Sequence, residues 1–238
     1  MENFVVHETD ERMFYLKDML GGVTTKTTTH VFAPNVLLTA KLLADTLEDS
    51  IVIGGRADNE AKALFNSLDI TYFNMLENEE FQAANARMTA EGALATLIDH
   101  SVLSLADMSV LIIGFGRTGA AMARILCEVG IRSIDIATTA SARPAHALAN
   151  RVIPAENFDF SPYDAIINTA PVSIIADHEV LTIKQSAVYI DLASVPAINL
   201  EYARYLGLDA DIYPIIPART SPISAAKAIK NYIRGVLK

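Results

Sequence analysis

The residues with the clearest chemical meaning form a glycine-rich loop near the middle of the 238-residue chain. An apolar run, 110–113, ends at the hexapeptide Gly114-Phe115-Gly116-Arg117-Thr118-Gly119, and an alanine-rich segment follows it. In a strand–turn–helix unit with this spacing, the first glycine permits the tight turn and the second lets the backbone approach a pyrophosphate. The third lets the helix pack closely on the strand. The N-terminus of that helix adds N–H groups and the positive end of the helix dipole. The loop therefore predicts a dinucleotide site, with a purely structural turn as the alternative.

The strand predicted next, 134–137, ends without the acidic residue that holds the adenosine ribose of NAD in such units. Thr138 stands in that place, whereas Asp135 lies within the strand and faces the other side of the sheet. The polar residues that follow are Thr139, Ser141 and Arg143. Hydroxyls and a guanidinium can bind a 2′-phosphate that a carboxylate would repel. We therefore expect NADP as the cofactor, with NAD or an ordinary polar loop as the alternatives.

Polar residues also follow two later predicted strands, 165–168 and 187–191, at the ends that face the ligand crevice of an open α/β sheet. The catalytic candidates there are Asn168, Asp191 and Ser194. The candidates for contact with the cofactor are Thr169, Ala170 and Pro171. Turn chemistry and loop capping are the alternative roles for these residues.

Composition argues against several classes of function. Hydrophobic residues make up 51% of the chain, which is typical of a globular protein. The net charge of −9 argues against nucleic acid as a partner, because phosphate contacts need clustered cations. Cys127 has no second cysteine to pair with, and the histidines show no ligand spacing, so we expect no metal site. With no charged-then-apolar leader and no apolar run of about 18 residues, we expect a cytoplasmic protein without a membrane partner.

Strand-like and helix-like segments alternate along the chain, which predicts a parallel α/β architecture. We expect a small α/β domain at 1–84, a connecting helix at 85–104, a Rossmann-type doubly wound parallel sheet at 105–218, and a C-terminal helix at 219–238 that packs back across the junction. Thr89 is the expected N-cap of the connecting helix. The other strands expected are 3–7, 30–33, 50–53, 70–74, 109–113, 151–153 and 211–213. The other helices expected are 10–20, 37–47 and 59–68, and the C-terminal segment is expected to be helical over 221–237.

From about Phe81 to its C-terminus the chain resembles the A subunit of bacterial dipicolinate synthase. The residues that carry the resemblance are Asn85, 89–92, the loop 114–119, 167–171, 191–194, Pro214, Pro217 and Pro222. The Gly-Arg-Thr-Gly and Asp-Leu-Ala-Ser sequences are specific to this family as a pair, and neither is specific alone.

This resemblance implies a nicotinamide-dependent oxidation of dihydrodipicolinate to the aromatic dicarboxylate that loads bacterial spores. Aromatisation favours loss of a hydride from the ring, and a base removes one ring proton. The resemblance also implies a flavodoxin-like fold for the smaller N-terminal domain, a homo-oligomer, and a partner in the flavoprotein-like B subunit of the synthase. The residues expected to bind this small anionic substrate are Arg12, Arg87, Glu91, Arg219 and Ser221.

The chain departs from the family pattern at several positions. Its first domain is shorter, with a strand–helix pair lost around 21–29, and Glu8-Thr9 stands where the family has two glycines. After Ser194 the family has an arginine and glycines, whereas this chain continues with Val195-Pro196-Ala197. Ile215 stands where the family has a glycine.

Two other functions are compatible with the same loop. A noncatalytic dinucleotide-binding protein that regulates or scaffolds a partner would need the glycine loop and no catalytic group. A D-2-hydroxyacid-dehydrogenase-like enzyme shares the two-domain layout, but it needs an arginine, an acid and a histidine around its cleft. His178 lies outside the strand-end position that such a histidine would occupy.

Overall fold

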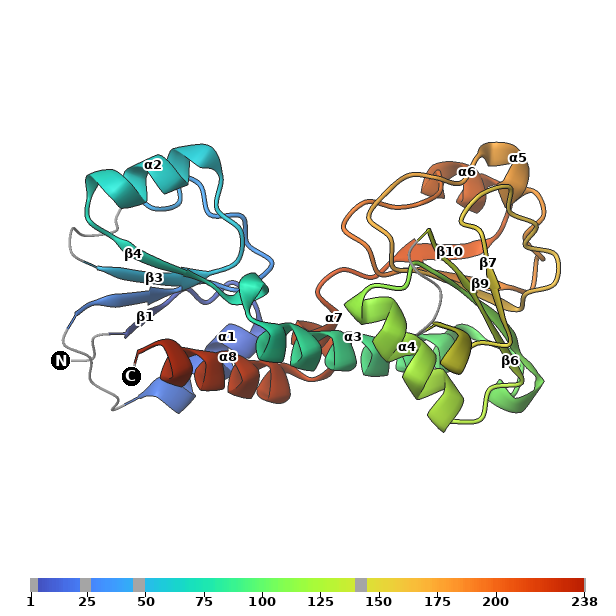
Figure 1. Cartoon of the computed structure of the whole chain (residues 1–238), viewed down its shortest axis with the longest axis horizontal. Helices are drawn as coiled ribbons and strands as arrows, with labels where there is room; N and C mark the ends of the chain where they lie inside the picture. Colours follow the sequence, from blue (N-terminus) through green and yellow to red (C-terminus); the bar gives the residue numbers. More distant parts are fainter. Residues whose placement is uncertain (1–3, 22–26, 45–49, 140–144, 238) are drawn as a thin grey trace. The chain divides into compact units, whose positions relative to one another are not determined.

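The computed structural model describes residues 4–21, 27–44, 50–139 and 145–237, and it divides into two compact units (Figure 1). Unit 1 comprises Met1–Asn85 and Pro217–Lys238, and unit 2 comprises Ala86–Ile216. Each unit is built around its own parallel sheet. Two of the expected cofactor contacts, Ser141 and Arg143, lie outside the described residues.

Unit 2 contains a six-stranded parallel sheet with the strand order β10-β9-β8-β5-β6-β7. Its strands are β5 Ser109–Ile113, β6 Ser133–Ala137, β7 Arg151–Ile153, β8 Ala165–Asn168, β9 Val188–Asp191 and β10 Asp209–Ile212. The chain winds outward from β5 to β7 and then returns to β8, β9 and β10, which is the doubly wound order of dinucleotide-binding sheets. The fold class predicted from the sequence is therefore confirmed. The winding direction reverses between β5 and β8, and ligands bind such sheets at the carboxyl ends beside this reversal.

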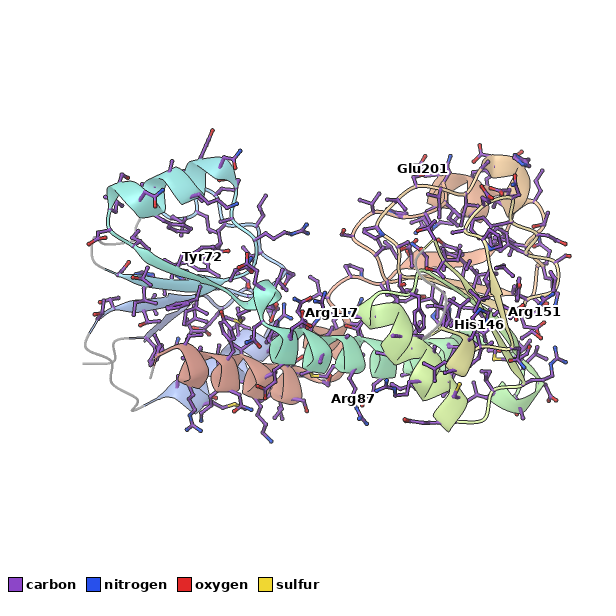
Figure 2. The ribbon with its side chains drawn as sticks, in the orientation of Figure 1. Tyr72, Arg87, Arg117, His146, Arg151 and Glu201 are labelled. Carbon is purple, nitrogen blue, oxygen red and sulfur yellow. The ribbon has the colours of Figure 1, made fainter. Side chains whose placement is uncertain are left out.

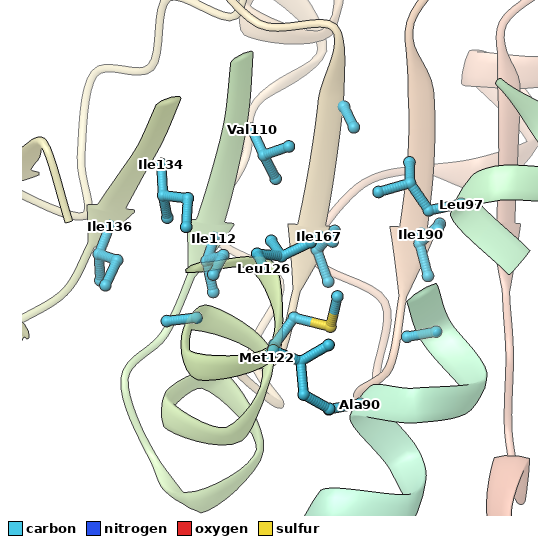
Figure 3. Packing of buried hydrophobic residues seen from close by; sticks show 14 of the residues in the cluster. Ala90, Leu97, Val110, Ile112, Met122, Leu126, Ile134, Ile136, Ile167 and Ile190 are labelled. Carbon is cyan, nitrogen blue, oxygen red and sulfur yellow. The ribbon is translucent and has the colours of Figure 1, made fainter. Parts of the chain in front are cut away.

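Both faces of this sheet are buried, because its central strands are apolar on both sides. On one face, alternate strand residues such as Val110 and Ile112 pack against α3 (Glu79–His100) and α4 (Arg117–Glu128), as Figure 3 shows. On the other face, Leu111 and its neighbours belong to a separate cluster. This packing fixes the sheet between its layers and holds the start of α4 at the end of β5.

Unit 1 is a smaller α/β unit whose four strands pair in parallel and in chain order. The strands are β1 Phe4–Val6, β2 Thr29–Val31, β3 Ile51–Gly54 and β4 Thr71–Asn74. Helices α1 (Glu11–Leu20) and α8 (Pro222–Val236) pack together on one face, and α2 (Asn59–Ser67) covers the other (Figure 1). Met13 and Ile229 are among the buried residues between α1, α8 and the sheet.

The connecting helix begins earlier than the sequence predicts. The sequence places it at 85–104 with Thr89 as its N-cap, but α3 begins at Glu79, and Thr89 lies in its interior. Asn78 supplies the cap, because its side-chain oxygen accepts the N–H of Phe81 at 2.8 Å. The pattern of an asparagine before two glutamates is itself a helix-start signal, and it competed with the threonine further along the chain.

The helix predicted at 37–47 is wrong for the residues that the structure describes there. Leu38 forms an isolated parallel bridge with Ala57, and the residues after it form turns. The hydroxyl of Thr39 accepts the N–H of Leu42 at 3.3 Å and its carbonyl accepts the N–H of Leu43 at 3.1 Å, so these described residues make a turn that is capped like a helix start but is not a helix. Leu38 and Leu43 are both buried, so the apolar spacing that suggested a helix reflects packing of a loop.

The remaining elements are short. They are α5 Asp177–Val180, α6 Leu200–Tyr205, α7 Ile216–Thr220, and the 3₁₀ helices η1 Met75–Glu77, η2 Leu105–Asp107 and η3 Ala145–Ala147. One or two turns are too few for hydrophobic periodicity to reveal them in the sequence. Among the described residues, no helix combines the length and the hydropathy that crossing a membrane requires.

Candidate functional site

The glycine-rich loop joins β5 to α4 at the carboxyl edge of the unit 2 sheet. Gly114 leaves the strand with φ of +91°, a left-handed value that favours glycine, and its N–H donates to the carbonyl of Ala137 at 2.8 Å. Gly116 is the N-cap of α4, and its carbonyl accepts the N–H of Ala120 at 2.9 Å. The N-terminus of α4, with the positive end of its helix dipole, therefore lies at this loop, and such an end attracts anions.

The space around the three glycines differs in the way that their predicted roles require. A β-carbon on Gly114 would lie 2.7 Å from the hydroxyl oxygen of Thr169, and one on Gly119 would overlap the carbonyl oxygen of Gly114. Packing inside the protein therefore demands glycine at both positions. A β-carbon on Gly116 would meet nothing within 4 Å. Gly116 thus borders open space at the N-terminus of α4, as is expected of a glycine whose backbone a pyrophosphate approaches.

The other three residues of the loop differ in their surroundings. Phe115 is half-buried and packs against the hydrophobic cluster beneath α4. Arg117 is exposed at the first turn of α4, where Figure 2 labels it. Thr118 is half-buried. The loop therefore combines a packed aromatic anchor with a cation at the end of the helix that attracts anions.

Thr169 fastens the end of β8 to the glycine loop. Its N–H donates to the carbonyl of Ile113 at 2.8 Å, and its hydroxyl lies 2.9 Å from the same oxygen and 3.2 Å from the carbonyl oxygen of Gly114. These contacts join the two strands between which the winding of the sheet reverses. The sequence predicts a cofactor contact for Thr169, and the structure directs its hydroxyl toward the loop itself. Beside it, Ala170 is half-buried and Pro171 is exposed.

Asp191 is the centre of a buried hydrogen-bond network at the end of β9. Its side chain is fully buried, and each carboxylate oxygen lies 3.0 Å from the side-chain nitrogen of Asn168. The N–H of Ala193 donates to Oδ1 and the N–H of Ala197 donates to Oδ2, both at 3.0 Å. The hydroxyl of Tyr189 donates to Oδ2 at 2.8 Å. The carboxylate thus ties the end of β8 to the loop that follows β9.

Tyr189 is the member of this network that sequence reasoning missed. It lies two residues before Asp191 on the same strand, so both side chains project from the same face of the sheet. This spacing of two residues on a predicted strand could have identified Tyr189 as a neighbour of Asp191. Burial raises the pKa of Tyr189, and the neighbouring Asp191 raises it further, so the phenol remains a hydrogen-bond donor.

The three catalytic candidates differ in access to solvent. Asn168 and Asp191 are fully buried and bonded to each other, while Ser194 is exposed on the loop after β9. Asn168 also donates to the carbonyl of Ala170 at 3.0 Å and accepts its N–H at 3.1 Å. In this arrangement Asn168 and Asp191 hold the loops in place, and of the three candidates Ser194 has the most direct access to a ligand. Catalytic roles for the three stay predictions.

At the end of β6 the position expected to contact the ribose carries hydroxyl groups. Thr138 is half-buried and its N–H donates to the carbonyl of Ile153 at 3.1 Å, while Thr139 is exposed. Asp135 is buried on the other face, as its place within the strand indicates. Its Oδ2 accepts from Arg151 at 2.6 Å and from the hydroxyl of Tyr163 at 2.8 Å. Asp135 therefore has a structural role that leaves it no access to a ribose.

Of the substrate-binding candidates in unit 1, Arg12 is buried and held by its neighbours. Its Nη2 donates to Asp10 at 2.9 Å and also to Asn35, which follows β2. Burial lowers the pKa of Arg12, and the carboxylate of Asp10 acts in the opposite direction. Arg219 is exposed, and Ser221 precedes α8 with its hydroxyl buried. Substrate contacts for these residues stay predictions.

The two candidates in unit 2 lie on α3. Arg87 and Glu91 are one turn apart and form an exposed ion pair with Nε 2.9 Å from Oε1 (Arg87 is labelled in Figure 2). Because both groups are solvated, this pair leaves each side chain able to exchange its partner for another charged group. The structure brings neither residue into contact with the glycine loop in any interaction that it describes.

Comparison with known proteins shows what this chain is similar to in sequence and in fold. No protein-family model matches the chain. Among curated proteins, the A subunit of dipicolinate synthase from Bacillus subtilis is 24% identical over 168 residues, which cover 68% of this chain and 56% of that protein. The chain thus spans little more than half the length of this relative.

Comparison with solved structures identifies proteins with a similar fold. The dipicolinate synthase A subunit from Bacillus halodurans superposes with a TM-score of 0.77 at 19% identity, covering 96% of this chain and 94% of the other. The D-isomer specific 2-hydroxyacid dehydrogenase from Lactobacillus delbrueckii ssp. bulgaricus, solved in its NAD-complexed form, superposes with a TM-score of 0.57 at 12% identity, covering 94% and 92%. The resemblance to the A subunit of dipicolinate synthase is therefore confirmed, and the fold is that of dinucleotide-binding dehydrogenases.

The open side of Gly116 gives a direct test of the dinucleotide site. We expect Gly116→Ala to weaken NADP and NAD binding about tenfold, or about 1.4 kcal/mol, because the added methyl group would occupy the space next to the backbone. The protein should still fold, since residue 116 has φ of −80° and the methyl group meets no protein atom, and the thermal midpoint should fall by only a few degrees because alanine is a poorer N-cap than glycine. Calorimetric titration and thermal melting measure the two quantities. Gly235→Ala is the matched control, because its β-carbon also meets nothing within 4 Å. Unchanged affinity in folded Gly116→Ala would contradict the predicted phosphate position.

The network around Asp191 predicts a stability effect. In Asp191→Asn, either orientation of the amide places its NH₂ group against a backbone N–H, that of Ala193 or that of Ala197. We expect the free energy of unfolding in urea to fall by about 2 kcal/mol, the cost of losing a hydrogen bond to a charged group. Ser194→Ala, an exposed change on the same loop, should alter it by less than about 0.5 kcal/mol. Equal stability of Asp191→Asn and the unsubstituted protein would show that the carboxylate is not the organising group.

Proposed function

We propose that this protein is a nicotinamide-dinucleotide-dependent oxidoreductase of the same type as the dipicolinate synthase A subunit, which oxidises dihydrodipicolinate or a related small carboxylated substrate. The observation that carries the proposal is the loop Gly114–Gly119. Two of its glycines are demanded by internal packing, and Gly116 borders open space at the N-terminus of α4. Similarity to dipicolinate synthase in sequence and in fold supports the substrate class.

In this function the residues of the chain bind and orient the ligands. The backbone at Gly116 and the first turn of α4 would hold the pyrophosphate, with the Arg117 guanidinium nearby. Asn168 and Asp191 would fix the loops after β8 and β9, from which Ser194 reaches solvent. The bound cofactor would supply the acceptor for a hydride.

For the cofactor we propose NADP in preference to NAD. Thr138 stands at the end of β6 where a carboxylate would hold the ribose of NAD, and Thr139 beside it is exposed. A 2′-phosphate meets no negative charge from these two residues. Arg143, which the sequence places four residues after Thr139, would add a cation.

One substitution tests the proposed preference for NADP. We expect Thr138→Asp to weaken NADP binding at least tenfold and to leave NAD binding equal or stronger, because the new carboxylate repels a 2′-phosphate and accepts hydrogen bonds from ribose hydroxyls. Calorimetric titration with both dinucleotides measures the ratio of affinities. Asn66→Asp, which adds the same charge on exposed α2, is the control. If the unsubstituted protein binds NAD more tightly, NADP is the wrong assignment.

A second function is favoured by one specific observation. Asn168 and Asp191 are fully buried, so neither offers a side chain to a substrate in the arrangement described. A dinucleotide-binding protein without catalytic activity, which regulates or scaffolds a partner, would have the same glycine loop and the same buried network. The two functions differ in turnover and not in cofactor binding.

Turnover separates the two functions. The protein is mixed with NADP and freshly prepared dihydrodipicolinate, made from pyruvate and aspartate semialdehyde, and separately with the monocarboxylate counterpart, dihydropicolinate. We expect reduced cofactor to accumulate with at least one of them, followed by its absorbance. Each assay is repeated with the B subunit of dipicolinate synthase, the partner that we propose from the resemblance. Dinucleotide binding without turnover in any of these assays would support the noncatalytic function and contradict the oxidoreductase.

A further inference from the structure

The loops that follow β8, β9 and β10 are uncharged. Residues 169–176, 192–199 and 213–216 contain no Asp, Glu, Lys, Arg or His. All of them are described, and they leave three adjacent strands at the same carboxyl edge of the unit 2 sheet. The carboxylate of Asp191, which immediately precedes the second loop, is fully buried and bonded to Asn168, Tyr189 and two backbone N–H groups.

These loops expose branched apolar side chains. Val172 and Ile174 after β8 are 48% and 37% exposed, Val195 after β9 is 46% exposed, and Ile215 after β10 is 39% exposed. We call these four residues the aliphatic edge. The loops are tied to one another, because Ile175 donates its N–H to the carbonyl of Ala197 at 3.1 Å.

The backbone conformation of Ile215 is a second, independent observation that points to a ligand site at this edge. Its φ is +60°, in the left-handed region that a β-branched residue rarely adopts. The other described non-glycine residues with positive φ are Asp69 and Asn157, which are types that tolerate it. Backbone strain of this kind persists where the surrounding structure imposes it, and it is concentrated at ligand sites.

The aliphatic edge limits what can be bound there. A carboxylate pressed against branched apolar side chains loses its hydration and gains no cation in return. In proteins such groups are usually met by arginine or lysine, and the three loops contain neither. A ring whose uncharged face lies against Val195 and Ile215 loses no such hydration when it binds.

We propose that the aliphatic edge binds the uncharged face of the substrate's ring, so that the protein selects a ring with one carboxylate over a ring with two. This rests on the proposed function, since it specifies the substrate class of the same site. It narrows the proposed substrates to the monocarboxylates among the small carboxylated rings.

Binding of two stable aromatic probes tests the selection without turnover. Picolinate, with one carboxylate, and dipicolinate, with two, are titrated by calorimetry in metal-free buffer into protein saturated with its preferred dinucleotide. We expect picolinate to bind at least fivefold more tightly. In Val195→Arg, a guanidinium at the aliphatic edge should favour the second carboxylate and shift the affinity ratio about tenfold toward dipicolinate. Val129→Arg, which adds the same charge at a valine 42% exposed at the other end of α4, should leave the ratio unchanged.

The outcomes separate this inference from the proposed function. Failure to bind either dinucleotide in the preceding titration contradicts the proposed function itself. With a dinucleotide bound, the inference is overturned if dipicolinate binds as tightly as picolinate, if neither probe binds, or if folded Val195→Arg leaves the ratio as it was. Should Val195→Arg fail to fold, the ratio in the unsubstituted protein decides alone.

Discussion

The buried carboxylate of Asp191 is the interaction on which the carboxyl edge of the unit 2 sheet depends. A charged group removed from water is tolerated only where hydrogen bonds replace its hydration, and here Asn168, Tyr189 and two backbone N–H groups do so. Because these donors come from β8, from β9 and from the loop after β9, one side chain sets the positions of separate segments. All of these donors are uncharged, so the network contains no cation that pairs with Asp191. Hydrogen-bond geometry, and not charge pairing, stabilises it.

A second constraint acts on the other side of the reversal in the sheet. Thr169 bonds to the carbonyls of Ile113 and Gly114, and the space that this hydroxyl occupies excludes a side chain from Gly114. The conformation of the glycine loop therefore depends on Thr169, which follows β8, as well as on the loop's own sequence. The buried network reaches this loop through Asn168, which immediately precedes Thr169. Asn168 and Thr169, for which the sequence predicts roles in catalysis and cofactor contact, thus also support the loops at this edge of the sheet.

The predicted function has two halves, dinucleotide binding and substrate binding, and the observations support the first better than the second. The dinucleotide half depends on backbone geometry, which three glycines and one helix N-terminus supply within a short stretch of chain. The substrate half depends on side chains from several loops. There, the structure has uncharged loops and exposed aliphatic residues, while Arg12 is buried against Asp10 and Asn35. A chain can retain the first half while the second changes, because the second does not determine the fold.

The sequence by itself determined most of the architecture of unit 2. Its strands are short, apolar and separated by regular helices and turns, so periodicity located β5, β7 and β8 at their observed bounds. The glycine spacing determined the turn, and the place of Asp135 within β6 determined that its side chain is buried within the sheet packing, bonded to Tyr163. Where two local signals competed, sequence reasoning failed. Asn78 and Thr89 could each cap a helix, and the leucines of 37–47 fit a buried loop as well as a helix.

Only the tertiary structure decided which polar residues are buried supports and which reach solvent. Asp191 and Ser194 stand three residues apart and look equally suited to chemistry in the sequence, yet one is fully buried and the other exposed. Burial depends on what lies across the sheet and under the loop, and those groups come from distant parts of the chain. The same holds for Gly114 and Gly116, whose roles differ because Thr169, 55 residues after Gly114, occupies the space beside one and not the other. Local sequence specifies the helices and strands, whereas contacts between distant segments specify which side chains are accessible to solvent.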